Sequence, residues 1–323
     1  MDRAHESIEF LIDAMGKYRD LPWVVGFSGG KDSTATLHLV VEALRSLDSD
    51  KRPRDVYVVY ADTLLEHPAL RSSALSILRS LGEYSERSLG GVVKPVVLRP
   101  GDGEDFLSMM IVRGYPAPWF RFRWCMERLK IRPFKRFAKG LGRYVLVSGV
   151  RLSESSERSR NIRSNYGSRK IVDGDLVVVM PLLDWGVEDV LELLSRARRW
   201  DGRDYKYLLD IYGVEVDGDC GCKLFTDVRF GCWVCTVVRV DKMPSPEALR
   251  RARERLIEIS RDPRYREPRE GGYGKLNRDG RAEVARVFIE AFKSEPEAFG
   301  YTKEEIKGIL KKAGLEELES ELA

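Results

Sequence analysis

The stretch that decides the fold is residues 23–33, WVVGFSGGKDS. An apolar run at 23–27 leads into a loop with two adjacent glycines, and residues 33–46 then carry apolar side chains at helical spacing. Glycines let the backbone turn tightly and approach a ligand closely. The N-terminus of the following helix offers free N–H groups and a partial positive charge to an anion. The stretch therefore predicts a strand, a phosphate-binding loop and a helix.

The side chains of this loop also suit a phosphate group, since they supply two hydroxyls and a lysine charge. The spacing is neither that of a Walker A loop, GxxxxGK[ST], nor that of a GxGxxG dinucleotide turn. A glycine-rich turn that merely starts a helix would explain the glycines but not both serines in this context. The predicted nucleotide-binding residues of the loop are Ser28, Gly29, Gly30, Lys31, Asp32 and Ser33.

Apolar runs and amphipathic stretches alternate over the first two hundred residues. Short buried strands are expected at residues 23–27, 56–60, 92–98, 144–149 and 176–180, with helices at 33–46, 66–81 and 126–139. Continuous apolar strands that alternate with helices are typical of a parallel sheet covered on both faces. The pattern predicts an α/β fold with a doubly wound, Rossmann-like parallel sheet.

The pattern changes after residue 185, where helices replace strands. They are expected at residues 187–198, 204–212, 247–260, 278–293 and 302–314, with Pro and Gly breaks at 262–274. A length of 323 residues agrees with two domains of roughly 150 residues each. We expect a nucleotide-binding α/β domain at 1–200, and a Cys-cluster segment plus a helical C-terminal region at 201–323.

Composition excludes several classes of protein. Hydrophobic residues make up 43% and charged residues 33%, which excludes a disordered or collagen-like chain. No apolar run approaches the roughly 18 residues of a membrane span, and the N-terminus lacks the apolar core of a secretory signal. We therefore expect a cytoplasmic protein with no membrane partner. The chain has no Gln and three Asn, which together with dense charge is a thermophile composition.

The cysteines form the second chemical signal. Four of the five lie within residues 220–235, which indicates a metal or redox site rather than a disulfide framework. Four thiolates hold either Zn²⁺ or a [4Fe–4S] cluster, and their spacing does not separate the two. The candidate metal ligands are Cys125, Cys220, Cys222, Cys232 and Cys235.

Six motifs in one order resemble the PP-loop ATP-pyrophosphatase superfamily, and within it the PAPS reductase-like family. The SGGKDS loop is similar to the superfamily signature SGGxDS, and Asp62-Thr63 is similar to a "DT" near the nucleotide. The segment RFGCWVCT resembles that of DndC, the DNA phosphorothioation member of the family. The other matching segments are PWFRFRWCMERLKIRP at 118–133, GVR at 149–151 and PLLDW at 181–185.

The resemblance implies an adenine nucleotide alpha hydrolase-like fold that cleaves ATP between its α and β phosphates with Mg²⁺. It implies catalytic roles for Lys31, Asp32, Asp62 and Arg151, of which Asp62 and Arg151 also lie near the nucleotide. It further implies a [4Fe–4S] cluster, with Zn²⁺ as the alternative. Its ligands would be Cys125, Cys232, Cys235 and either Cys220 or Cys222, and the spare thiol would carry sulfur or be buried.

A DndC-like protein would be a sulfurtransferase that adenylates an acceptor and inserts sulfur into it. The implied acceptor is DNA or another nucleic acid, the sulfur donor is a cysteine desulfurase, and other phosphorothioation subunits are possible partners. One alternative is a PAPS or APS reductase-like enzyme that binds an adenylated sulfonucleotide, although the reductases' C-terminal cysteine has no counterpart after Cys235. The others are a tRNA thiolation enzyme and a non-catalytic nucleotide-binding redox sensor.

Two basic stretches, residues 119–136 and 151–170, leave two interpretations open. The first stretch interleaves cations with aromatic residues, as a site for a phosphate backbone and stacked bases does. Ion pairs with Glu127, Glu154 and Glu157 explain the same composition in a thermophile-like chain.

Overall fold

The computed structural model describes residues 2–154, 169–212, 231–236 and 245–322. The chain divides into two compact units, and each is assembled from separate segments. The first consists of Met1–Tyr60, Ser72–Val97 and Ala138–Val228, and the second of Ala61–Arg71, Leu98–Phe137 and Arg229–Ala323. Both units contain residues from either side of position 200, and the domain boundary placed there stays a prediction.

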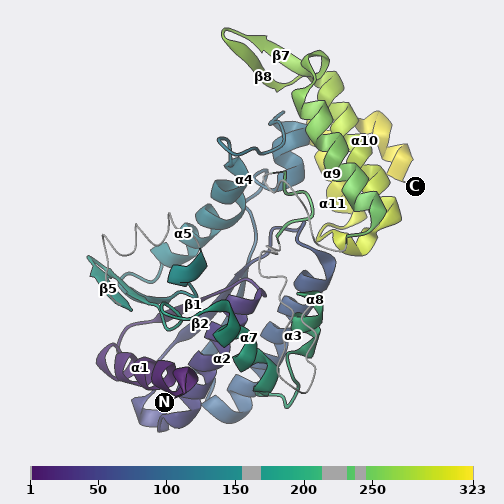
Figure 1. The fold of residues 1–323 in the computed structure, drawn as a ribbon. Coiled ribbons are helices and arrows are strands. Elements are labelled where there is room, and N and C mark those ends of the chain that lie inside the picture. The colour runs from purple at the N-terminus through teal and green to yellow at the C-terminus, as the bar shows by residue number, and fades with distance from the viewer. Residues whose placement is uncertain (1, 155–168, 213–230, 237–244, 323) are drawn as a thin grey trace. The chain divides into compact units, whose positions relative to one another are not determined.

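A six-stranded, mostly parallel sheet confirms the expected α/β class (Figure 1). The strand order is β3-β2-β1-β4-β6-β5, and β1 pairs in parallel with β2 and β4. The edge strand β5 is antiparallel to β6 because a short turn at Gly174, with φ of 55°, joins the two. The bounds are β1 (Trp23–Phe27), β2 (Val56–Ala61), β3 (Val93–Leu98), β4 (Tyr144–Val147), β5 (Lys170–Asp173) and β6 (Leu176–Val179).

The strand order reverses between β1 and β4. From β1 the chain continues to β2 and β3 on one side, whereas β4, β6 and β5 lie on the other. In open α/β sheets, ligands bind beyond the carboxyl ends of the strands at such a switch point. The segments that leave these two strands, beginning at Ser28 and Ser148, are therefore where a ligand of this unit is expected.

Helices flank the sheet of the first unit (Figure 1). α2 packs against α1 and α7, and most of its side chains are buried. Trp185 is fully buried and donates from Nε1 to the hydroxyl of Ser7 on α1 at 3.1 Å, which ties α1 to the segment before α7. The bounds are α1 (Arg3–Lys17), α2 (Lys31–Ser46), α3 (Pro68–Tyr84), α7 (Val187–Arg196) and α8 (Lys206–Ile211).

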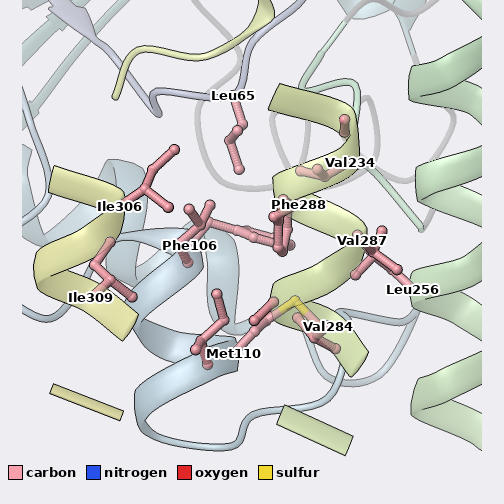
Figure 2. Packing of buried hydrophobic residues seen from close by; sticks show 14 of the residues in the cluster. Leu65, Phe106, Met110, Val234, Leu256, Val284, Val287, Phe288, Ile306 and Ile309 are labelled. Atoms are coloured by element: carbon pink, nitrogen blue, oxygen red, sulfur yellow. The ribbon is translucent and has the colours of Figure 1, made fainter. Parts of the chain in front are cut away.

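The second unit is mainly helical, as expected for the C-terminal region. Figure 2 shows Phe106 and Met110 packed against Phe288 of α10 and Ile306 and Ile309 of α11. Burial of such side chains contributes roughly 25 cal/mol per Å² of apolar surface, so this cluster holds the unit together. The bounds are α4 (Trp124–Met126), α5 (Arg132–Lys139), α9 (Glu247–Arg261), β7 (Arg266–Arg269), β8 (Gly272–Leu276), α10 (Arg278–Ser294) and α11 (Lys303–Ala313).

Short 3₁₀ and π-helical turns join these elements. The π-helical turns extend helices locally at Ser85–Leu89, Ser108–Val112 and Glu127–Ile131. The 3₁₀ turns are Ser49–Lys51, Leu152–Glu154, Pro263–Tyr265, Pro296–Ala298 and Glu316–Leu322. No helix in the described part of the chain is long and apolar enough to cross a membrane.

Candidate nucleotide site and cysteine site

The loop after β1 is closed by its own hydroxyl groups. Gly29 has φ of 75°, a left-handed conformation that favours glycine. The Ser33 hydroxyl accepts from the Ser28 amide at 3.1 Å, lies 3.0 Å from the Ser28 hydroxyl and donates to the Gly30 carbonyl at 3.0 Å. Gly30 is the N-cap of α2 and provides no side-chain cap. The N-cap position thus supplies no side-chain acceptor to the first N–H groups of α2, an arrangement that suits an anion at a helix N-terminus.

A small charge network surrounds the first turn of α2. Asp32 accepts from Lys31 Nζ at 2.9 Å and from Arg151 Nε at 2.7 Å. Arg151 is only 4% exposed and also donates to the Ser153 hydroxyl at 2.8 Å. Two cations and one carboxylate leave a net positive charge next to the start of α2. The structure therefore brings together three of the four predicted catalytic residues.

Gly149 explains how Arg151 reaches this position. A Cβ atom at Gly149 would lie 2.7 Å from the Thr36 hydroxyl and 3.1 Å from the Asp32 carbonyl oxygen. Only glycine allows the segment after β4 to pass this close to α2. The GVR segment thus places its arginine over the loop through direct backbone packing.

Tyr212 also contributes to the loop, and sequence analysis did not single it out. Its hydroxyl accepts from the Lys31 amide at 3.3 Å, and Lys31 Nζ lies 5.3 Å from the centre of its ring. A Cβ atom at Gly30 would lie 3.2 Å from this hydroxyl, so the second glycine of the loop makes room for the tyrosine. No local motif marks Tyr212, because the contact joins positions 181 residues apart.

Asp62, the fourth predicted catalytic residue, belongs to the second unit. It is 1% exposed and accepts two hydrogen bonds from Arg71, at 2.9 and 2.8 Å. It also accepts from the Leu64 amide at 3.1 Å, and Leu64 is the one described non-glycine residue with positive φ, 69°. Asp62 therefore fixes the backbone that follows β2, and its catalytic role stays a prediction.

Three cysteines lie in the described part of the second unit. Cys125 is in α4, and Cys232 and Cys235 share a turn in which the Cys235 amide donates to the Cys232 carbonyl at 2.9 Å. Burial raises the pKa of Cys125, and the nearby Cys235 thiol raises it further. Burial also raises the pKa of Cys232, to about 12, although the Lys130 ammonium opposes this shift. As free thiols, Cys125 and Cys232 are thus protonated at neutral pH.

Polar side chains surround Cys232. The Thr63 hydroxyl lies 3.2 Å from Cys232 Sγ, and the backbone of Glu66 forms an isolated antiparallel bridge with Cys232. Lys130 Nζ donates to the Glu66 carboxylate at 2.9 Å. Loss of hydration lowers the pKa of Lys130, but Glu66 and the sulfur atoms of Cys232 and Cys125 raise it more, so Lys130 is a permanent cation here. Lys130 lies in the first basic stretch, residues 119–136, and the sequence does not indicate its pairing with Glu66.

The cysteine site agrees in donor type with a thiolate-bound metal. Soft thiolates suit both Zn²⁺ and iron–sulfur clusters. Within the described residues, no three His, Cys, Asp or Glu side chains are grouped as a metal site. Cys220 and Cys222, the other two predicted ligands, lie outside the described residues. The metal stays a prediction.

Ion pairs account for much of the first basic stretch. Arg128, Arg132 and Arg136 all donate to Glu104, and Lys130 is paired with Glu66 as described above. Burial alone would raise the pKa of Glu104, but these three guanidinium groups lower it below its ordinary value. Four cations of the stretch are therefore in ion pairs, but with Glu104 and Glu66 instead of the acids named from the sequence. Of those acids, Glu127 lies 3.6 Å from Arg132. Residues 155–168, which hold most of the second stretch, lie outside the described residues.

Comparisons with known proteins connect part of the chain to one family. Residues 110–237 match the phosphoadenosine phosphosulfate reductase domain, a segment that contains Cys125, Arg151 and Cys235 but not the loop at 28–33. "Uncharacterized protein MJ0066" of Methanocaldococcus jannaschii is 27% identical over 69% of this chain and 38% of its own length. "Uncharacterized nin region protein ORF290" of Escherichia phage lambda is 25% identical over 52% of this chain and 57% of its own length. The chain thus spans about two fifths and somewhat over half of these relatives.

Two solved structures are also similar to the chain. The PAPS reductase of Candida auris has 15% identity and a TM-score of 0.40, over 66% of this chain and 87% of that one. The FMN adenylyltransferase of Candida glabrata has 14% identity and a TM-score of 0.39, over 68% of this chain and 61% of that one. Among these comparisons, it is the match of residues 110–237 that supports a likeness of this chain to the PAPS reductase-like family.

Proposed function

We propose that the chain is an ATP-pyrophosphatase-type sulfurtransferase, which adenylates an acceptor and then replaces the adenylate with sulfur. The observation that carries this proposal is the pairing of Arg151 with Asp32 at the switch point of the sheet, beside the start of α2, whose N-cap residue is a glycine. The position is where an open α/β sheet binds its ligand, and the charge is positive, as a polyphosphate requires.

The loop suits the β and γ phosphates of ATP. Backbone N–H groups at the start of α2 would donate hydrogen bonds to the phosphate oxygens, and Lys31 and Arg151 would neutralise the charge that develops on leaving pyrophosphate. An acceptor oxygen then attacks the α-phosphorus, and the bond to the β-phosphate bridging oxygen breaks. Mg²⁺ prefers carboxylate and phosphate oxygens. Because Asp32 already pairs with two cations, the nucleotide phosphates would supply most of the ligands for this ion.

The cysteines are the proposed site of sulfur handling. Cys125, Cys232 and Cys235, with Cys220 or Cys222, would hold a [4Fe–4S] cluster, and Zn²⁺ is the alternative metal for the same thiolates. By the DndC resemblance, the acceptor is a nucleic-acid phosphate and a cysteine desulfurase supplies the sulfur, with other phosphorothioation subunits as partners. A persulfide from this donor would attack the adenylated phosphorus with its outer sulfur, so that a P–S bond forms, the P–O bond to AMP breaks and AMP leaves. A further thiol would then cleave the S–S bond and leave the sulfur on the acceptor.

A PAPS or APS reductase-like enzyme is the second candidate, favoured by the family matched at residues 110–237. Such an enzyme would bind an adenylated sulfonucleotide at the same loop and release sulfite. The tRNA thiolation enzyme shares the proposed loop chemistry and differs only in its acceptor. The redox sensor would bind the nucleotide without turnover.

The deciding experiment is product analysis with ATP labelled at the α or γ phosphate, with oligonucleotides as acceptors. We expect AMP and pyrophosphate, and a loss of at least tenfold in rate for Lys31→Ala. Lys51→Ala is the matched control, because Lys51 is an exposed lysine of the same unit that pairs with Asp48. ADP and orthophosphate as first products would contradict the proposal. Sulfite release from PAPS or APS without ATP cleavage would favour the reductase.

A further inference from the structure

A cavity of about 820 Å³ lies entirely within the second unit. One wall is the segment 115–122, and the other consists of the end of α9 and the β7–β8 hairpin. This hairpin joins α9 to α10 (Figure 1). We call it the hairpin groove. The lining side chains that matter here are Trp119, Arg121, Arg261, Arg269, Tyr273 and Lys275.

The hairpin groove is strongly cationic. Arg121, Arg261, Arg269 and Lys275 are exposed, and none of the four has an ion pair among the described residues. No described Asp or Glu lines the groove. In the same unit Arg128, Arg132 and Arg136 share Glu104, so their charge is balanced within the chain. The four cations of the hairpin groove, which have no ion pair among the described residues, are therefore available to a polyanion.

Two aromatic rings on opposite walls of the groove are exposed to solvent. Trp119 is 52% exposed and Tyr273 is 55% exposed, both unusually high for large aromatic side chains. The backbone holds Trp119 in place, because Trp119 and Phe122 exchange two hydrogen bonds of 3.3 and 2.8 Å. Tyr273 follows Gly272 at the turn of the hairpin. Such rings offer flat faces on which nucleobases stack.

The two walls are joined by hydrogen bonds, so the groove exists before any ligand binds. The Ala117 amide donates to the hydroxyl of Ser260 on α9 at 2.8 Å, and the Leu276 amide of β8 donates to the Gly114 carbonyl at 2.6 Å. Arg266 donates to the Ser260 carbonyl and to the Gly274 carbonyl, which holds the hairpin against α9. A preformed site loses less conformational entropy when a ligand binds.

We propose that the hairpin groove binds a single-stranded segment of nucleic acid. Phosphates would contact the four cations, and unpaired bases would stack on Trp119 and Tyr273. A duplex would satisfy the cations but not the rings, since its bases are already stacked. An acidic peptide would contact the cations but would likewise not stack on the rings of Trp119 and Tyr273. The inference rests on the proposed function only where it identifies this strand as the sulfur acceptor, because binding itself requires no ATP.

The test uses the full chain without ATP and a fluorescein-labelled hexanucleotide, as DNA and as RNA, with affinity measured by anisotropy across a salt series. Trp119→Ala/Tyr273→Ala should weaken binding at least tenfold and leave the salt slope unchanged. Arg121→Ala/Arg269→Ala should also weaken binding and reduce the slope by about 1.4, since each phosphate contact to a single strand contributes about 0.7.

Two matched controls use residues of the same unit outside the groove. Phe120 is 72% exposed and adjoins Trp119 but does not line the groove, so Phe120→Ala should change affinity less than twofold. Arg250→Ala/Lys311→Ala removes two exposed cations elsewhere and should leave the slope unchanged. A preference between the DNA and RNA hexamers would identify the natural strand.

Three outcomes would overturn the inference: groove variants that bind like the controls, a duplex that binds more tightly than the single strand, or polyglutamate that competes as well as the hexamer. ATP cleavage separates this failure from failure of the proposed function. Groove variants that keep AMP formation but lose the hexamer support the groove alone, and a chain that binds the hexamer without cleaving ATP contradicts only the proposed function.

Discussion

Arg151 donates from Nε to Oδ1 of Asp32 at 2.7 Å and so connects the segment after β4 to the first turn of α2. These two segments leave the strands on either side of the switch point. Asp32 accepts from Lys31 with its other oxygen, so one carboxylate orients both cations of the proposed phosphate site. Asp32 thus orients the side chains of Lys31 and Arg151, and its negative charge offsets part of their positive charge at the start of α2.

The first prediction concerns this pair. Asp32→Asn leaves Arg151 nearly buried without its carboxylate, which should lower the free energy of unfolding by about 2–4 kcal/mol. The same change should reduce AMP formation at least tenfold, because Lys31 and Arg151 lose their common orienting partner. Chemical denaturation and the labelled-ATP assay measure the two effects.

Arg151→Gln and the double variant complete a cycle that isolates the pair. If the two residues act together, the double variant should lose less than the sum of the single losses, with a coupling of about 1–3 kcal/mol. Additive losses would show that the pair does not act as a unit.

The second prediction concerns Gly29, whose φ of 75° is unfavourable for other residues. Gly29→Ala should cost about 1–2 kcal/mol of stability and weaken ATP binding, because the loop would relax away from its closed form. Gly16→Ala is the control, since a Cβ at that helical position meets nothing within 4 Å. It should be neutral or stabilise by about 0.5–1 kcal/mol. Equal ATP affinity for Gly29→Ala and the parent chain would exclude the loop as the phosphate site.

Much of the fold could be predicted from the sequence, because buried parallel strands read as continuous apolar runs. β1 was predicted at its observed bounds, and the other predicted strands differ from the structure by two residues or fewer at either end. Three features were not predicted. They are α1, which lies before the motifs, β5, which has no continuous apolar run, and the hairpin at 266–276. The Arg, Glu and Gly residues of this hairpin lack the apolar–polar alternation of a strand, so the sequence indicates a break there.

The candidate site was predictable only where motif and local backbone coincide. The loop residues and Arg151 come together as the sequence suggested, because a strand–loop–helix and a glycine at 149 place them. The contact of Tyr212 with the loop and the ion pair of Lys130 with Glu66 join segments that are distant in the sequence. No local spacing of residues predicts such contacts. The division into two units, each built from separate segments, also depends on contacts between distant parts of the sequence.

The third prediction is a pH dependence from Glu104, whose pKa is lowered by Arg128, Arg136 and Arg132 against the effect of burial. A carboxylate with a lowered pKa stabilises the fold above its unfolded value of about 4.3 and loses this contribution as the pH falls through its folded value. Glu104→Gln should therefore cost about 1–2 kcal/mol at pH 7, after allowance for the partly exposed arginines.

The difference between Glu104→Gln and the parent chain should shrink below pH 4 and vanish once the parent carboxyl is protonated. Glu317→Gln is the control, since Glu317 makes one exposed pair with Arg278 and should show a much smaller effect. A difference that stays constant from pH 7 to pH 3 would show that the loss does not come from the charge of Glu104.

The last prediction concerns the metal. Protein purified without oxygen should contain about four irons and absorb in the visible range if the thiolates hold a [4Fe–4S] cluster, or one zinc if they do not. Cys232→Ser and Cys235→Ser should each lower the bound metal severalfold, because soft thiolate ligands are lost. Thr63→Val is the matched control, since Thr63 contacts Cys232 Sγ at 3.2 Å but is not a thiol, and it should keep the metal content of the parent. Chelation of the metal should leave ATP binding intact, because the loop residues belong to the first unit and the described cysteines to the second. Equal metal content in the parent and both cysteine variants would exclude these cysteines as ligands.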